Sequence, residues 1–383
     1  MINTKSILAA TALFVSSFSV FAQGEANNWY FGKGAGIKFT PDSAIAVTSG
    51  KLHTEEGSAS ISDKAGNLLF YTNGITVWNK QHRVMPNGNG LMGGKSSTQS
   101  ALIIPKPDSD KIYYIFTTDI QAQSDGFRYS VVDMSKQDGL GDIISRNNFL
   151  MIPATEKLTA VRHSNNKDWW VIAHRWNSNA YTAYLVDADG VTMKPVVSNV
   201  GTVHGGSNRK AIGYLQPSPD GTKLASALWD DVSNFELLDF NRTTGKLSNP
   251  ILFKGFAEAY GVAFSPDGTK LYGAANGVGG GKAQIVQFDL KAGSPAAIIK
   301  SGVVVGTSTS PRFGSLQLAP DGKIYVARKD SKFLGVIEKP NAKGEAVTYK
   351  DDGLLLAGRR SDLGLPNFAQ GMVSSSKTQS ASK

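Results

Sequence analysis

Apolar residues along this chain fall in short runs, and within most runs they alternate with polar or small residues. Residues 224–228, 271–274 and 324–328 are typical runs, and each follows a turn sequence. Alternation with a period of two predicts β-strands with one buried face. No part of the body carries the apolar spacing of a long amphipathic helix. The pattern therefore predicts an all-β protein, and 41 glycines and 15 prolines agree with frequent turns.

A nearly identical phrase precedes three of these strands. It reads Ser-Pro-Asp-Gly-Thr-Lys-Leu at 218–224 and again at 265–271, and Ala-Pro-Asp-Gly-Lys-Ile at 319–324. Its proline stands at 219, 266 and 320, so the offsets are 47 and 54 residues. Periods of about 40 to 50 residues are typical of the four-stranded blades of a β-propeller.

The Pro-Asp-Gly turns have a mechanical explanation. Proline presets φ, aspartate caps the turn through its side chain, and glycine accepts a positive φ before the chain re-enters the sheet. Acidic turns also collect cations, but a calcium site needs several converging oxygen ligands and each turn offers one carboxylate. We therefore expect these aspartates to be structural.

Each repeat divides into four strands, from the innermost outward. We expect one blade at 212–216, 224–228, 235–240 and 250–253, the next at 261–264, 271–274, 283–289 and 296–301, and another at 315–318, 324–328, 334–339 and 346–350. Three degenerate copies begin with inner strands at 58–62, 101–105 and 158–163. These make six blades.

The seventh blade is predicted to be shared by the two ends of the chain. Residues 365–373 look like an innermost strand, whereas 29–32, 37–40 and 44–48 look like three strands that lack one. Joining them closes the ring and removes its open edges. We predict a seven-bladed β-propeller with four-stranded blades, with six blades as the alternative if the N-terminal strands pair elsewhere.

The chain ends indicate export. Residues 1–22 read as a signal peptide, with Lys5, an apolar core at 7–15 and a small-residue site at Val20-Phe21-Ala22. The apolar core is too short to span a membrane, so we expect no integral membrane segment after cleavage. Residues 23–373 are expected to form the propeller domain and 374–383 a polar disordered tail. We expect a monomer in the periplasm, on the outer surface or secreted.

Charge indicates the class of partner. The 383 residues carry a formal net charge of +9 and no cysteine, and the pI is near 9.4. A basic protein favours anionic partners, and export argues against nucleic acid. An acidic glycan or an envelope protein is the expected partner, although a generally lysine-rich surface is the alternative explanation of the charge.

Several longer phrases resemble one family. They include Asn-Trp-Tyr-Phe-Gly at 28–32, Ser-Ile-Ser-Asp at 60–63, Ser-Thr-Gln-Ser at 97–100, Gly-Leu-Gly-Asp at 139–142 and Gly-Leu-Pro-Asn-Phe at 364–368. Together they resemble the secreted WD-repeat-like propeller modules of gliding-type Bacteroidetes that use type IX secretion. The resemblance implies the fold and a cell-surface or periplasmic setting, and almost no activity. Such proteins often continue into adhesive repeats and a C-terminal sorting domain, whereas this sequence ends in a Ser/Lys-rich stretch at 374–383.

Loops of a propeller sort onto two faces. Connections from an outer strand to the next inner strand share one face, here called the loop face, with the connections between second and third strands. The Pro-Asp-Gly turns lie on the opposite face, here called the turn face. The predicted binding residues of the loop face are His174, Arg175, Trp176, His204, Arg209, Trp229, Arg312, Arg328, Arg359 and Arg360. A central funnel lined by them would attract polyanions and stack on sugar rings. The alternative is that these side chains point apart into water.

The candidate chemistry is limited. The loop His204-Gly205-Gly206-Ser207-Asn208-Arg209 has amides and a guanidinium that suit an anion. His53, His174 and His204 fall on one face, but their loops belong to different blades, so we predict no metal site and no cofactor. No nucleophile elbow, His-Glu-x-x-His motif or phosphate loop is present.

The sequence therefore predicts a non-catalytic binding or scaffolding propeller. The alternative is a polysaccharide lyase on uronate glycans, with His174 or His204 as base and Arg209 neutralising the carboxylate. A third option is a structural part of a secretion or motility assembly.

Overall fold

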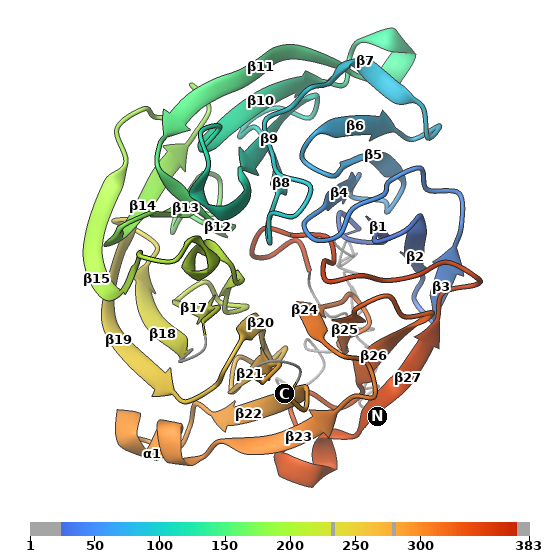
Figure 1. The fold of residues 1–383 in the computed structure, drawn as a ribbon. Coiled ribbons are helices and arrows are strands. Elements are labelled where there is room, and N and C mark those ends of the chain that lie inside the picture. Colours follow the sequence, from blue (N-terminus) through green and yellow to red (C-terminus); the bar gives the residue numbers. More distant parts are fainter. Residues whose placement is uncertain (1–23, 231–233, 278–280, 374–383) are drawn as a thin grey trace, which may run out of the picture.

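A computed structural model of the chain shows a ring of seven antiparallel β-sheets around a central axis (Figure 1). The structure describes residues 24–230, 234–277 and 281–373. Six sheets have four strands and one has three. The prediction of a seven-bladed all-β propeller is confirmed. The predicted signal peptide and polar tail lie outside the described residues.

The blades follow one another in chain order. The first blade contains β1 (Asn28–Phe31), β2 (Ala35–Phe39) and β3 (Ala44–Val47). The second contains β4 (Ala59–Ser62), β5 (Leu68–Thr72), β6 (Thr76–Asn79) and β7 (Val84–Asn89). The third contains β8 (Ala101–Pro105), β9 (Ile112–Thr118), β10 (Phe127–Asp133) and β11 (Asp142–Met151). The next two contain β12 (Ala154–Arg162), β13 (Trp169–Arg175), β14 (Ser178–Val186) and β15 (Val196–His204); and β16 (Leu215–Pro217), β17 (Lys223–Leu228), β18 (Asn234–Asn241) and β19 (Lys246–Lys254). The last two contain β20 (Ala259–Phe264), β21 (Lys270–Ala275), β22 (Gln284–Asp289) and β23 (Val303–Thr307); and β24 (Phe313–Leu318), β25 (Ile324–Arg328), β26 (Phe333–Ile337) and β27 (Tyr349–Leu355).

The core lies between neighbouring blades, because each sheet buries both faces against the next. Trp29, Trp169 and Tyr260 are among the largest fully buried side chains. Single turns of 3-10 helix occur at Ile120–Ala122, Gln137–Gly139, Asn208–Ala211 and Gly344–Val347. None of the helices in the described residues is long and apolar enough to cross a membrane.

The Pro-Asp-Gly turns form as predicted. Asp220 accepts a hydrogen bond from the Thr222 amide at 3.0 Å, and Asp267 accepts one from the Thr269 amide at 3.0 Å. The following glycine, Gly221, has a φ of 71°. That region of φ is open to glycine at little cost.

The outer strand predicted at 296–301 is wrong. The outer strand expected at 296–301 is the helix α1 (Pro295–Lys300), and β23 provides the outer strand three residues later. Ser294 caps the helix by accepting a hydrogen bond from the Ala297 amide at 3.2 Å, and proline follows the cap. A serine cap followed by proline and alanines is a helix start, and this signal outweighs the weak alternation.

The closing blade also differs from the prediction. The three N-terminal strands form its sheet, but residues 365–373 do not form a regular strand beside them. They belong to an axial segment, Ser361–Val373, that crosses the centre of the ring (Figure 1, red). Phe368 still reaches the first blade, with its ring centroid 5.9 Å from that of Trp29. The first blade and the last described stretch of the chain therefore contact each other through side-chain packing, and the predicted strand pairing is absent from the described residues.

The axial segment is bonded to inner strands around the ring. Leu363 donates to Glu55 O at 2.9 Å and accepts from the Ser315 amide at 2.8 Å. The Asn367 amide donates to Ser58 O at 2.9 Å, and Gln370 donates to Ala160 O at 2.8 Å. Residues 361–369 are all buried.

Candidate functional site

Three neighbouring blades place charged side chains on the loop face at the start of their inner strands. Arg209 precedes β16, Glu258 precedes β20 and Arg312 precedes β24. Trp229 follows β17 of the first of these blades. Because inner strands of a propeller converge on the axis, the residues before them converge as well.

The two arginines share one carboxylate and one indole ring. Arg209 Nη2 lies 3.4 Å from Glu258 Oε1, and Arg312 Nε lies 3.7 Å from Glu258 Oε2. Their guanidinium carbons lie 5.7 Å and 5.2 Å from the centroid of the Trp229 ring. The arginine side chains remain 53% and 35% exposed, whereas that of Glu258 is 5% exposed. This arginine pair thus presents two cations over a single buried acid.

The structure corrects the prediction of exposed tryptophans. Trp229 is 4% exposed and Trp176 is 7% exposed. Trp229 packs edge-on against Tyr260, with ring centroids 5.7 Å apart. Because both residues are buried, neither ring offers a face on which a sugar ring can stack.

The two predicted histidines meet, but they are inaccessible. The rings of His174 and His204 stack with centroids 4.0 Å apart, and their residues are 0% and 1% exposed. Burial lowers the pKa of His174 to about 3 and that of His204 well below its usual value. Lys157, also fully buried, lowers both pKa values further through its charge. The lyase alternative therefore gains no accessible base from these positions.

The remaining predicted residues are spread over the face. Arg175 is exposed at the end of β13. Arg328 is buried and pairs with Asp351 at 2.8 Å, so it is structural. Arg359 donates to Thr48 O at 3.2 Å, and Arg360 lies 3.6 Å from Asp330.

The predicted open funnel is filled by the axial segment. Leu363, Leu365 and Phe368 occupy the centre of the ring, 8%, 1% and 3% exposed. In the part of the chain that is described, no three His, Cys, Asp or Glu side chains gather closely enough to hold a metal ion. A ligand on the loop face thus meets a surface, and the arginine pair is its best-organised cationic feature.

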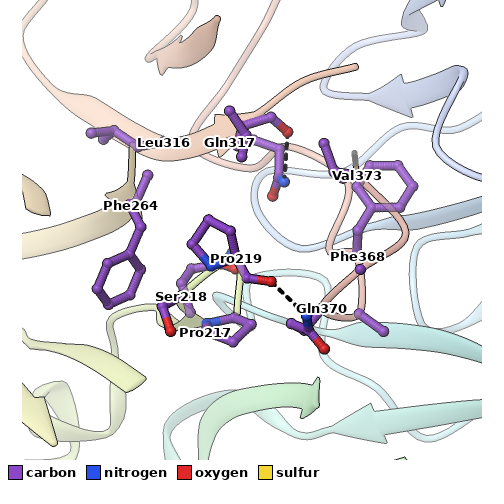
Figure 2. Close-up of a pocket in the computed structure, with 14 residues that line it drawn as sticks. Pro217, Ser218, Pro219, Phe264, Leu316, Gln317, Phe368, Gln370 and Val373 are labelled. Atoms are coloured by element: carbon purple, nitrogen blue, oxygen red, sulfur yellow. Dashed lines mark hydrogen bonds between the residues drawn. The ribbon is translucent and has the colours of Figure 1, made fainter. Parts of the chain in front are cut away.

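A pocket on the turn face escaped the sequence interpretation. It lies where β16, β20 and β24 end, with Pro219 on one side and Phe368 on the other (Figure 2). The empty space between its walls is about 440 Å³, a figure that includes open solvent at its mouth. Two of its lining residues, Gln216 and Gln317, interrupt apolar inner strands, and that interruption was the available sequence signal.

Comparison with solved structures finds chains that align over most of this one. A protein from Bacteroides uniformis, named provisionally as a 6-phosphogluconolactonase, is 12% identical with a TM-score of 0.50, over 87% of this chain and 98% of that one. The β-propeller domain of Cps50 (Swd1) from Myceliophteria thermophila is 11% identical with a TM-score of 0.43, over 80% and 94%. A protein from Desulfotomaculum acetoxidans of unknown function is 14% identical with a TM-score of 0.48, over 90% and 99%. No family model matches the chain, and neither does any curated protein. Likeness at these identities shows a shared fold alone.

Proposed function

We propose that this protein is an exported, non-catalytic binding propeller whose loop face receives an acidic partner. The observation that carries the proposal is the arginine pair, in which Arg209 and Arg312 share Glu258. Two guanidinium groups over one carboxylate leave donor capacity and positive charge for an incoming anion. Packing on Trp229 limits the motion of both side chains, which lowers the entropic cost of binding.

An acidic glycan is the partner that this chemistry fits best. Carboxylates along a uronate polymer are planar acceptors that match the guanidinium fork. The axial segment fills the funnel, so the loop face is a surface without a central hole. A polymer can therefore lie across this face. The burial of His174 and His204 favours binding over lyase chemistry.

Retention on polygalacturonate tests the proposal. Wild-type protein should bind an immobilised polymer at moderate salt, and the double variant Arg209→Ala/Arg312→Ala should bind at least about tenfold more weakly, which corresponds to about 1.4 kcal/mol. Adding Glu258→Gln in a triple variant avoids leaving a buried carboxylate without its two arginine partners. The triple variant should fold like wild type and still bind weakly.

Lys194→Ala/Lys246→Ala is the matched control. It removes two exposed charges at the turn face, Lys194 between β14 and β15 and Lys246 at the start of β19. Its retention should change less than about twofold, since exposed distant charges are screened by salt. Equal losses in the two double variants would mean that net charge alone drives retention. An absence of wild-type retention would reject the acidic-glycan partner, and new unsaturated ends in the polymer would favour the lyase.

A further inference from the structure

The pocket on the turn face is built from one repeat position in three consecutive blades. Gln216, Ala263 and Gln317 stand 47 and 54 residues apart, the same offsets as the Pro-Asp-Gly turns that follow them. All three line the pocket. Ala263 of the middle blade is small and leaves space at this position. The two flanking blades contribute the side-chain amides of Gln216 and Gln317 beside that space.

Both amides are buried and incompletely satisfied. Gln216 is 7% exposed and Gln317 is 6% exposed. Within the described residues, Gln216 Nε2 has no acceptor, and Gln317 Oε1 has no donor. Gln317 Nε2 donates to Leu318 O at 3.0 Å (Figure 2), which leaves its oxygen as the unused group. A buried donor and a buried acceptor without partners each cost about 1–3 kcal/mol, so a ligand that pairs with both atoms would recover that free energy.

The other walls of the pocket are apolar or firmly anchored. Phe264, Pro219 and Phe368 surround the opening (Figure 2). Gln370 is held by donating its side-chain amide to Pro219 O at 2.6 Å and accepting from the Arg162 amide at 3.2 Å. The apolar walls are therefore preformed, and among the described residues that line the pocket the buried side-chain atoms without a hydrogen-bond partner are Gln216 Nε2 and Gln317 Oε1.

We propose that this pocket is a second binding site, independent of the arginine pair, that takes an acetamido group. The carbonyl of such a group accepts from Gln216 Nε2, its N–H donates to Gln317 Oε1, and its methyl packs against the apolar wall. The terminal amide torsion of glutamine is soft, so both side chains can turn toward the ligand. Because the pocket is partly open to solvent, the part of the ligand beyond the acetamido group stays outside. N-acetylated sugars and N-acetylated peptides both present an acetamido group.

Titration by ligand-observed NMR with two matched pairs of probes tests the proposal. N-acetylglucosamine is compared with glucose, which lacks the acetamido group. N-acetylalanine methyl ester is compared with O-acetyllactate methyl ester, which lacks only the N–H. At least one acetamido probe should bind, and each control should bind at least about tenfold more weakly. Binding of the sugar alone or of the peptide alone identifies the source, and binding of neither overturns the proposal.

Variants separate a binding role from a structural one. Gln216→Met and Gln317→Met should each weaken binding about 5- to 30-fold, the ratio expected from 1–2 kcal/mol. The thermal midpoint of Gln216→Met should stay the same or rise, because a buried amide with an unpaired donor is removed, whereas Gln317→Met also loses the hydrogen bond to Leu318 O. Gln81→Met, at an exposed site, should bind like wild type, and Ala263→Val should obstruct the space between the amides. Wild-type affinity in both glutamine variants would refute the site, whatever the outcome on polygalacturonate.

Discussion

Gln99 and Asn367 show what the most distinctive residues of this chain do. Asn367 Nδ2 donates to Leu158 O at 2.9 Å, and its Oδ1 accepts from Gln99 Nε2 at 3.3 Å. Gln99 Oε1 also accepts from the Leu215 amide at 2.8 Å. The two residues belong to the phrases at 97–100 and 364–368 that carry the family resemblance. Those phrases therefore fasten the axial segment, which is a structural role.

The sequence predicted which charged residues share a face better than it predicted the burial and the partners of those residues. It placed Arg209, Arg312 and Trp229 on one face, and they do meet. It could not see that Trp229 is covered, because exposure depends on which neighbours a loop brings over the ring. It also missed Glu258, since an acid in a loop looks solvated until its arginine partners are known.

The buried histidines should make stability depend on pH. In the unfolded chain a histidine takes up a proton below its ordinary pKa of 6.5, whereas folded His174, with its pKa lowered by burial, stays neutral down to about 3. The unfolded state thus binds more protons between these values, and stability falls as pH falls from 6.5 toward 3. Near pH 5 the His174 contribution is about 1 kcal/mol per pH unit.

His174→Phe should therefore flatten this dependence. Urea unfolding at pH 7, 6 and 5 should show a shallower loss of stability in the variant than in wild type, with the difference growing toward low pH. If the free energy of unfolding falls equally with pH in the variant and in wild type, His174 becomes protonated while the protein remains folded.

At the scale of elements, local signals decided which predictions held. The Pro-Asp-Gly turns were predictable because the chemistry of the turn lies within four residues. Helix α1 was missed because residues 296–301 were assigned to an outer strand, and the serine cap and proline before them were not used as a helix signal. The axial segment was missed for a different reason, since an apolar stretch with Pro366 and two glycines satisfies a strand pattern until its partners are known.

Asn367→Ala should be strongly destabilising. The change leaves the carbonyls of Ala101 and Leu158 without the amide donor and shortens a side chain at the centre of the ring. We expect a loss of about 3 kcal/mol in the free energy of unfolding, as for other buried polar networks. Asn341→Ala, which removes one exposed acceptor of the Asp267 amide, should cost less than about 1 kcal/mol. Similar midpoints for both variants in denaturant unfolding would disprove the fastening role of Asn367.

At the scale of the molecule, the repeat period was enough to count the blades. The offsets of 47 and 54 residues between the Pro-Asp-Gly turns each correspond to one blade. The rest of the 383-residue chain is long enough for the degenerate copies. The mode of closure was not predictable from the period. A pattern that repeats from blade to blade carries no information about a segment that occurs once.

Removal of the axial segment should weaken the entire ring. A chain that ends after Arg360 loses Leu365 and Phe368 from the centre, and burial of these two side chains alone contributes about 3–6 kcal/mol. Compared with a chain that ends after Val373, it should melt at a lower temperature and less cooperatively in circular dichroism. Matching melting curves would show that the blades hold each other without a filled axis.

The position of the axial segment after the last blade has a consequence for the order of folding. Synthesis proceeds from the N-terminus, so all seven sheets leave the ribosome before the residues that tie their inner edges together. Until the axial segment has been synthesised, its apolar side chains are missing from the centre of the ring. The first blade also lacks the contact between Trp29 and Phe368. Completion of the propeller therefore depends on residues that are synthesised after every blade.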